Sequence, residues 1–288
     1  MNVLTEGGAM PGVGIIHIDE IEPTLLKLEK ALGIDLKNNT LGSVGKKEFS
    51  GDIDIALDID TDDIPAFVEK LKNIPEVLDI AKSSVIMTKV KIADYDPNKK
   101  VEGKPRTGYV QVDFMPGDTN WLKTFYHAPH EKDSKYKGVY RNLLIASIAA
   151  HLDKKESEQK ISDGRPIESE RFMWSPSDGL VRVLRTPEPK KNGEGYTKKN
   201  NNKIIDGPYK NPDDIVKVLK LDGPDDLYSY ETLRKAIDKN YPPKLVDLIL
   251  KDFADNSIVK DVGVPTDIKL SESVGTTDWF RIILDVIK

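Results

Sequence analysis

The string Leu-Gly-Ser-Val-Gly-Lys-Lys-Glu-Phe-Ser-Gly-Asp-Ile-Asp-Ile, residues 41–55, decides the fold that this sequence predicts. From residue 52 to residue 59, acidic and apolar side chains largely alternate, which predicts a β-strand. Successive side chains of a strand point to opposite faces, so Asp52 and Asp54 should share one face while the isoleucines pack behind the other. Two carboxylates about 7 Å apart along a strand are hard oxygen ligands that suit Mg²⁺ or Mn²⁺.

A second acidic strand is predicted at residues 109–115. Alternation places Tyr109, Gln111 and Asp113 on one face and three apolar side chains on the core face. If this strand lies beside the first, Asp113 joins the other two aspartates, and three carboxylates can hold two metal ions about 4 Å apart. Asp113 is then either a third metal ligand or the general base that takes the proton of an attacking hydroxyl.

The turn before the first strand offers groups that bind phosphate. Gly42 lets backbone amides approach phosphate oxygens, and Ser43 adds a hydroxyl donor. Lys46 and Lys47 could add positive charge, although lysines at such positions are commonly plain surface residues. An alternating acidic strand is likewise typical of a solvated sheet face, and Gly-Ser steps mark ordinary turns. The combination of the turn with two aspartate-bearing strands favours the functional interpretation.

An apolar residue, Gly-Ser, eight further residues and Asp-apolar-Asp-apolar together resemble the signature of the DNA polymerase β-like nucleotidyltransferase superfamily. The resemblance covers roughly residues 22–118. It implies that Gly42 and Ser43 bind the nucleotide phosphates, that the paired aspartates bind two divalent ions, and that Asp113 completes the site. The longer string over residues 41–55 resembles nucleotidyltransferases encoded by tailed bacteriophages, which implies expression in an infected bacterium.

The composition limits the class of protein. There are no cysteines, which excludes disulfide-linked partners and thiolate metal sites. Lys and Arg number 43 and Asp and Glu 48, a net charge of -5 that disfavours nucleic-acid binding by the surface as a whole. Local basic stretches at residues 132–141 and 190–203 argue the other way. No apolar run approaches the roughly 18 residues of a membrane span, and no secretory leader is evident, so we expect a cytoplasmic protein without a membrane partner.

Periodicity and turn signals predict an α+β protein in two parts. Residues 1–120 should form a catalytic domain, a mixed sheet with helices on one face, and residues 121–288 a mostly helical, hairpin-containing domain that binds the acceptor. The expected elements are an arm over 7–18, helices at 23–32 and 65–75, strands at 52–59, 85–92 and 109–115, a helix at 139–152, a hairpin turning at 176–179, an exposed loop or linker at 186–210, and helices at 212–220, 229–239 and 243–254.

The expected reaction is transfer of a nucleoside monophosphate from a nucleoside triphosphate to a hydroxyl, with Mg²⁺ or Mn²⁺ as cofactor and release of pyrophosphate. The acceptor stays open between RNA, a small molecule and a protein side chain. Residues 126–132, Tyr-His-Ala-Pro-His-Glu-Lys, follow the third strand and either contact this second substrate or form a polar loop. Two other classes compete: a structural or virion protein that keeps a degenerate transferase fold, and a toxin-like modifier of host tRNA or protein.

Overall fold

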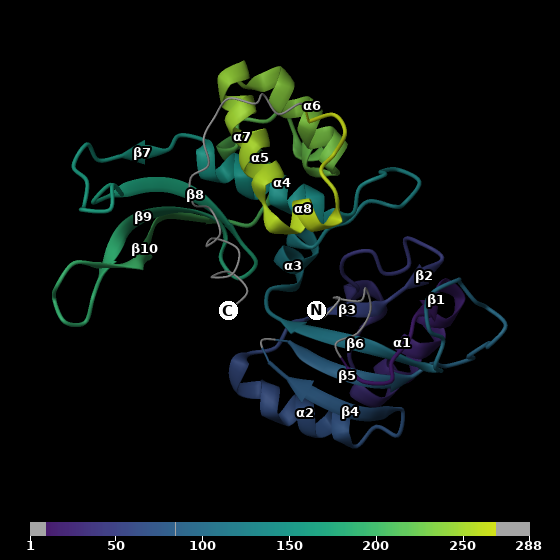
Figure 1. The fold of residues 1–288 in the computed structure, drawn as a ribbon. Coiled ribbons are helices and arrows are strands. Elements are labelled where there is room, and N and C mark those ends of the chain that lie inside the picture. Colours follow the sequence, from purple (N-terminus) through teal and green to yellow (C-terminus); the bar gives the residue numbers. More distant parts are fainter. Residues whose placement is uncertain (1–9, 84, 269–288) are drawn as a thin grey trace. The chain divides into compact units, whose positions relative to one another are not determined.

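The chain forms two compact units, Met1–Gly138 and Val139–Lys288 (Figure 1). The structure, a computed structural model, describes residues 10–83 and 85–268; residues 7–9 of the expected arm lie outside this part. The division falls later than residue 120 because α3 (Thr119–Phe125) packs on the sheet of the first unit, where Leu122 meets Leu41 and Ala56. Among the described helices, none is long and apolar enough to cross a membrane.

The first unit is built on a four-stranded mixed sheet in the order β3-β6-β5-β4 (Figure 1). β3 and β6 run parallel, and the other two pairings are antiparallel. β4 was missed by the sequence-based expectation because it is an edge strand whose side chains do not alternate between buried and exposed. The bounds are β3 Asp52–Leu57, β4 Val77–Lys82, β5 Ile86–Lys91 and β6 Tyr109–Pro116.

Both long helices of this unit cover one face of the sheet. Ile53 and Ile55 of β3 join one apolar cluster with Val112 of β6, and the inward side chains of α1 and α2 belong to the same cluster. The mixed sheet with helices on one face is therefore confirmed. The remaining elements of the unit are β1 Ile16–His17, α1 Ile18–Leu32, β2 Phe49–Ser50, α2 Ile64–Lys72 and short 3₁₀ turns at Lys37–Asn39 and Thr61–Asp63.

Helix α1 begins at Ile18 rather than at Pro23, which lies inside the helix. The start is fixed by a capping box: the His17 ring accepts a hydrogen bond from the backbone of Asp19, and Glu20 accepts one from the backbone of His17. Histidine is not among the usual N-cap residues, so the sequence signal pointed to the proline instead. The end at Gly33 is as predicted, because this residue adopts the left-handed conformation with φ 71° and donates its N–H to Glu29.

A buried ion pair ties three segments of the first unit together. Arg106 donates to both carboxylate oxygens of Glu20 at 2.9 and 2.6 Å, and it also donates to the carbonyls of Ile15 and Asp96 at 2.9 and 3.0 Å. Only 4% of the arginine side chain and 2% of the glutamate side chain are exposed. The arm before α1, the helix itself and the loop between β5 and β6 therefore meet at one charged centre.

The second unit contains five helices in its described part, α4 to α8, and a four-stranded antiparallel sheet in the order β10-β9-β8-β7. The hairpin of β8 and β9 is confirmed, with Ser175 opposite Gly179. Helix α4 is buried along most of its length. The bounds are α4 Gly138–His151, β7 Lys155–Glu156, β8 Ser169–Ser175, β9 Gly179–Pro189, β10 Tyr196–Tyr209, α5 Pro212–Val218, a 3₁₀ turn Pro224–Leu227, α6 Tyr230–Asn240, α7 Pro243–Asp255 and α8 Ser257–Val262.

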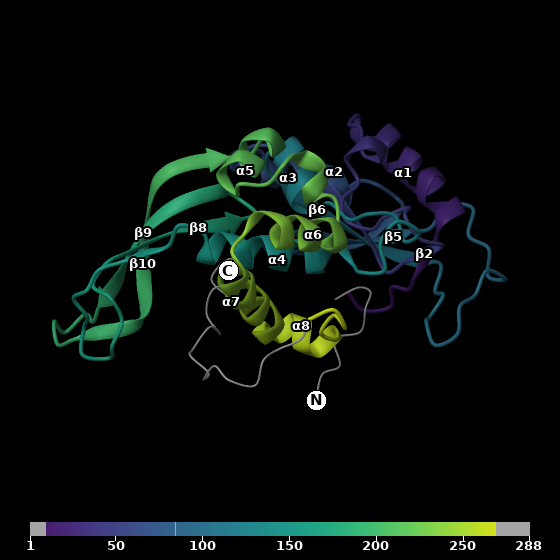
Figure 2. The same cartoon turned by 90° about the horizontal axis from the view of Figure 1, so that it is seen from above.

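The expectation of a loop or linker at residues 186–210 is wrong. β9 continues to Pro189, and β10 pairs with it as a strand of 14 residues (Figure 2). Nearly every residue of β10 is exposed, so neither face carries the apolar alternation by which a strand is detected in a sequence. This strand is defined by its backbone pairing with β9, and the register of that pairing is irregular.

The buried ion pair leads to a stability prediction. We expect Arg106→Ala to lower the free energy of unfolding by about 3–5 kcal/mol, because it leaves a buried carboxylate without its partner. The matched control is Lys72→Ala, which removes an exposed pair with Glu69 and should cost less than about 1 kcal/mol. Urea denaturation followed by circular dichroism measures both. Equal effects of the two substitutions would contradict the central role of Arg106.

Candidate metal centre

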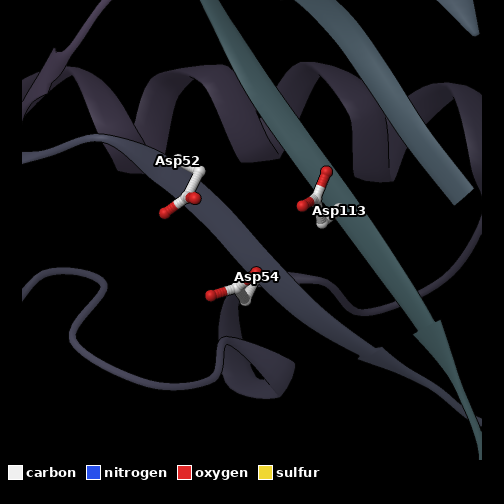
Figure 3. A group of neighbouring side chains, drawn as sticks. All are labelled: Asp52, Asp54 and Asp113. Carbon is white, nitrogen blue, oxygen red and sulfur yellow. The ribbon is translucent and has the colours of Figure 1, made fainter. Parts of the chain in front are cut away.

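Three aspartates meet on the sheet face opposite the helices. In the parallel pairing of β3 with β6, Asp54 lies opposite Asp113 and Asp52 lies opposite Gln111. Figure 3 shows the three carboxylates projecting to the same side of the two strands. One ligand oxygen from each residue can be chosen so that all three lie within 4.8 Å of one another. The prediction that the two acidic strands lie side by side is thus confirmed.

The local sequence explains why the carboxylates share a face. Ile53 and Ile55 are fully buried on the helix side, as are Val112 and Phe114 of β6. Since the side-chain period of a strand is two, burying these residues turns the intervening aspartates to the other face. The acidic cluster is therefore positioned by the apolar core behind it.

Burial disfavours the ionised form of all three groups, and repulsion from neighbouring carboxylates adds to this effect at Asp54 and Asp113. Burial, with the neighbouring charges of Asp52 and Asp113, raises the pKa of Asp54 to about 8. Burial and the charge of Asp52 raise the pKa of Asp113 to about 6, although a hydrogen bond from Gln111 opposes the rise. Burial also raises the pKa of Asp52, against the opposing charge of Lys47. A cation bound among these groups would favour their ionised forms.

The donor set fits a hard divalent cation. Oxygens bound to one Mg²⁺ at 2.0–2.1 Å can lie at most about 4.2 Å apart, and a pair of ions about 4 Å apart tolerates a wider spread. The three ligand oxygens lie up to 4.8 Å apart. A small side-chain rotation would therefore let them bind one ion, and their present spacing suits two ions. Asp52, Asp54 and Asp113 are the residues that would hold it.

The turn of residues 41–46 lies directly beside this cluster. The Leu41 N–H donates to the carbonyl of Asp54 at 2.8 Å, and a side chain at Gly42 would begin 3.6 Å from the Asp54 carboxylate. That distance is ordinary contact, so Gly42 is favoured by its positive φ of 60° rather than by lack of space. Ser43 is exposed at the tip of the turn. Gly42 thus lies next to the Asp54 carboxylate, and Ser43 follows it in the turn.

Lys46 in the turn and Lys47 directly after it differ in their surroundings. The ammonium group of Lys46 donates to the carbonyl of Ala128 within this unit. Lys47 instead lies close enough to Asp52 for its charge to lower the pKa of that carboxyl against the effect of burial. Of the two lysines that the sequence offered for the phosphates, Lys47 is the one whose charge acts on the acidic cluster.

Residues after β6 return to the site from far along the chain. Gly42 forms an isolated β-bridge with His127, and the Glu131 N–H donates to the Lys46 carbonyl at 3.4 Å. Burial and the charge of Asp54 raise the pKa of Tyr126, which therefore lies within electrostatic reach of the cluster. The sequence marked residues 126–132 only as a polar loop or a substrate contact. No local signal identifies Tyr126 as the residue that approaches Asp54.

The repulsion within the cluster leads to a pH-dependent prediction for metal-free protein. The folded pKa of Asp54, about 8, lies above the unfolded value of about 3.9, so the folded state holds the extra proton between these values and stability falls as pH rises. We expect Asp54→Asn to be more stable than the wild type by roughly 1–3 kcal/mol at pH 8, and by much less at pH 5.

Urea unfolding in EDTA at the two pH values measures this difference. Adding Mg²⁺ should stabilise the wild type more than Asp54→Asn, because only the wild type keeps all three carboxylates. The same stability difference at pH 5 and pH 8 would show that Asp54 does not carry the repulsion.

No known family model matches this sequence, and no curated protein matches it. Among solved structures, two of polymerase beta from Leishmania infantum are similar to parts of the chain. For the ternary gap complex the TM-score is 0.32 at 16% identity, covering 58% of this chain and about half, 51%, of that one. For the ternary P/T complex the TM-score is 0.35 at 15% identity, covering 73% and 75%.

Proposed function

We propose that this protein is a metal-dependent nucleotidyltransferase that moves a nucleoside monophosphate from a nucleoside triphosphate to a hydroxyl. The observation that carries the proposal is the meeting of Asp52, Asp54 and Asp113 on two parallel strands, with ligand oxygens within 4.8 Å. Three partly buried carboxylates with raised pKa values are costly to keep together without a cation. Such sites are candidates for function because their electrostatic cost has no structural return.

In the proposed reaction, the acceptor oxygen forms a bond to the α-phosphorus and the bond from that phosphorus to the bridging oxygen breaks, releasing pyrophosphate. Divalent ions, when bound, would supply positive charge that offsets the charge developing in this transfer. Asp52 and Asp54 would hold these ions, and Asp113 would either join them, with the proton of the acceptor hydroxyl passing to solvent, or accept that proton itself. The Gly42 and Ser43 turn binds the phosphates of the triphosphate, with positive charge from Lys46 or Lys47.

The string of residues 41–55 supports membership of the polymerase β-like nucleotidyltransferase superfamily. An origin in a tailed bacteriophage, and with it action in the cytoplasm of an infected bacterium, is a narrower part of the proposal. It rests on the similarity of the longer string alone. The same proposal assigns residues 1–120 to catalysis and the rest of the chain to binding of the acceptor.

The proposed acceptor is RNA, and the supporting feature is the ribbon of β9 and β10. Residues 185–205 carry six Lys or Arg and two Glu, a net charge of +4, so the rest of the chain carries -9 to reach the total of -5. Lys191, Lys199 and Lys203 on this ribbon are all exposed. A two-stranded ribbon with exposed lysines can follow a phosphate backbone, and RNA ends supply an acceptor hydroxyl.

Loss of one aspartate should stop the reaction. With Mg²⁺ or Mn²⁺ and each labelled nucleoside triphosphate in turn, wild-type protein should label a fraction of host RNA. We expect Asp52→Asn, Asp54→Asn and Asp113→Asn each to reduce labelling roughly 100-fold or more, since a metal ligand supports several kcal/mol of transition-state stabilisation. The matched control is Asp58→Asn, an exposed aspartate just past β3, which should keep its activity.

Three other outcomes of this experiment would each favour a different conclusion. Transfer that persists in all three variants would overturn the site assignment. A wild-type protein that binds neither Mg²⁺ nor Mn²⁺ would favour the structural or virion protein with a degenerate fold. Label that moves to host tRNA or protein together with toxicity on expression, both lost in Asp52→Asn, would favour the toxin-like modifier.

Binding of RNA should depend on the ribbon. Replacing Lys191, Lys199 and Lys203 by glutamine should weaken RNA binding and reduce the slope of log affinity against log salt by about 2, at roughly 0.7 for each lost single-strand phosphate contact. Filter binding of host RNA between 50 and 200 mM salt, with single-stranded DNA in parallel, measures this. The control replaces Lys70, Lys72 and Lys82 of the first unit, and an equal loss in both triples would contradict the role of the ribbon.

A further inference from the structure

Gln111 is a buried polar residue on the same sheet face as the acidic cluster. It lies opposite Asp52 in the β3–β6 pairing, and only 3% of it is exposed. Its side-chain Nε2 donates to both carboxylate oxygens of Asp113, at 2.9 Å each. Both oxygens of one candidate metal ligand are thus held by a single amide group.

The other end of this amide is held by the N-terminal arm. The backbone N–H of Met10 donates to Gln111 Oε1 at 3.0 Å, in a buried contact that joins residues 101 positions apart. A backbone N–H can only donate, so it requires the oxygen of the amide on its side and turns the NH₂ group toward Asp113. The ionised Asp113 carboxylate, which only accepts, favours the same orientation, so the two contacts together fix the amide.

The arm itself is firmly seated on the sheet. Gly14 donates its N–H to the Tyr109 carbonyl at 2.8 Å, and Ile15 donates to the Pro105 carbonyl at 3.0 Å. A side chain at Gly14 would begin 2.5 Å from that same Pro105 oxygen, so the arm approaches more closely than any other residue allows. The ammonium of Lys89 also donates to the Pro11 carbonyl at 3.1 Å.

We propose that Gln111, oriented by the backbone of Met10, is a positioning residue that fixes the Asp113 carboxylate for metal binding. Hydrogen bonds to a metal ligand fix its orientation, and their loss commonly weakens metal affinity by 10- to 100-fold. The inference rests on the proposed function in one respect, that Asp113 is a metal ligand. It makes the N-terminal arm part of the site, although the arm holds no acidic residue in its described part before Asp19.

The test is the affinity of full-length protein for Mn²⁺ alone, measured by electron paramagnetic resonance titration. Gln111→Met keeps the approximate volume but removes all three of these side-chain hydrogen bonds, and we expect Mn²⁺ affinity to fall about tenfold. Met10→Pro removes the backbone donor together with the buried methionine side chain, and it should lower affinity by a smaller factor, about threefold. Met10→Leu retains the N–H and a buried apolar side chain, so it should bind Mn²⁺ more tightly than Met10→Pro.

A control variant on the neighbouring strand β5 distinguishes a positioning role of Gln111 from a purely structural one. Thr88 is fully buried on the helix side of β5 and donates to the Val112 carbonyl at 2.8 Å. Thr88→Val should lower thermal stability without changing Mn²⁺ affinity. If Gln111→Met fails to fold, the Mn²⁺ affinities of Met10→Pro and Met10→Leu still test the positioning role, because only Met10→Leu keeps the N–H that binds Gln111.

Mn²⁺ affinity within twofold of the wild type in both Gln111→Met and Met10→Pro would overturn the positioning role. Weaker Mn²⁺ binding by these variants, in a protein that transfers no nucleotide to any acceptor, would support the positioning role while overturning the proposed reaction. A wild-type protein that binds no Mn²⁺ would overturn both.

Discussion

The parallel pairing of β3 with β6 is the constraint on which the candidate site depends. Its register sets Asp54 opposite Asp113, and a slip by one residue would turn one set of carboxylates into the apolar core. The register is held from behind, since buried side chains such as Ile53, Ile55 and Phe114 pack beneath the two helices. Each such side chain contributes about 1.5–3 kcal/mol on burial, so their sum can hold acidic groups together against repulsion.

This arrangement separates what stabilises the fold from what the site can do. The face of the sheet covered by α1 and α2 is apolar, and the opposite face carries three carboxylates whose ionised forms are disfavoured by burial and, at Asp54 and Asp113, by neighbouring carboxylates. A cluster of this kind is preorganised for a cation because the protein has already brought the ligands together during folding. The electrostatic cost of this preorganisation is the rise in the pKa values of Asp54 and Asp113.

Sequence patterns predicted the elements that have one buried face. β3 and β6 alternate clearly, and Gly33 ends α1 as a left-handed cap, so these were correct. β4 and β10 were missed because an edge strand and an exposed ribbon bury little on either face, and backbone pairing leaves no trace in side-chain periodicity. The start of α1 was missed because its cap is an unusual one, His17.

The site shows the same division between local and distant information. Alternation was enough to place the three aspartates, and also Gln111, on one face. It could not show that the Met10 N–H donates to the Gln111 amide, nor that Tyr126 approaches Asp54. Met10 and Tyr126 both lie outside the span of roughly 22–118 that carries the motif.

The motif therefore identifies the ligands of the candidate site but not its limits. Met10 reaches Gln111 from before the motif, and the segment containing His127 bridges to Gly42 from after it. These contacts depend on the packing of the whole first unit, including the Arg106 centre that holds the Ile15 carbonyl of the arm. A shortened chain that keeps all three aspartates and the glycine-serine turn would lose the groups that orient them. All of these contacts lie within the compact unit that ends at Gly138, so the groups that surround the carboxylates extend beyond the motif on both sides.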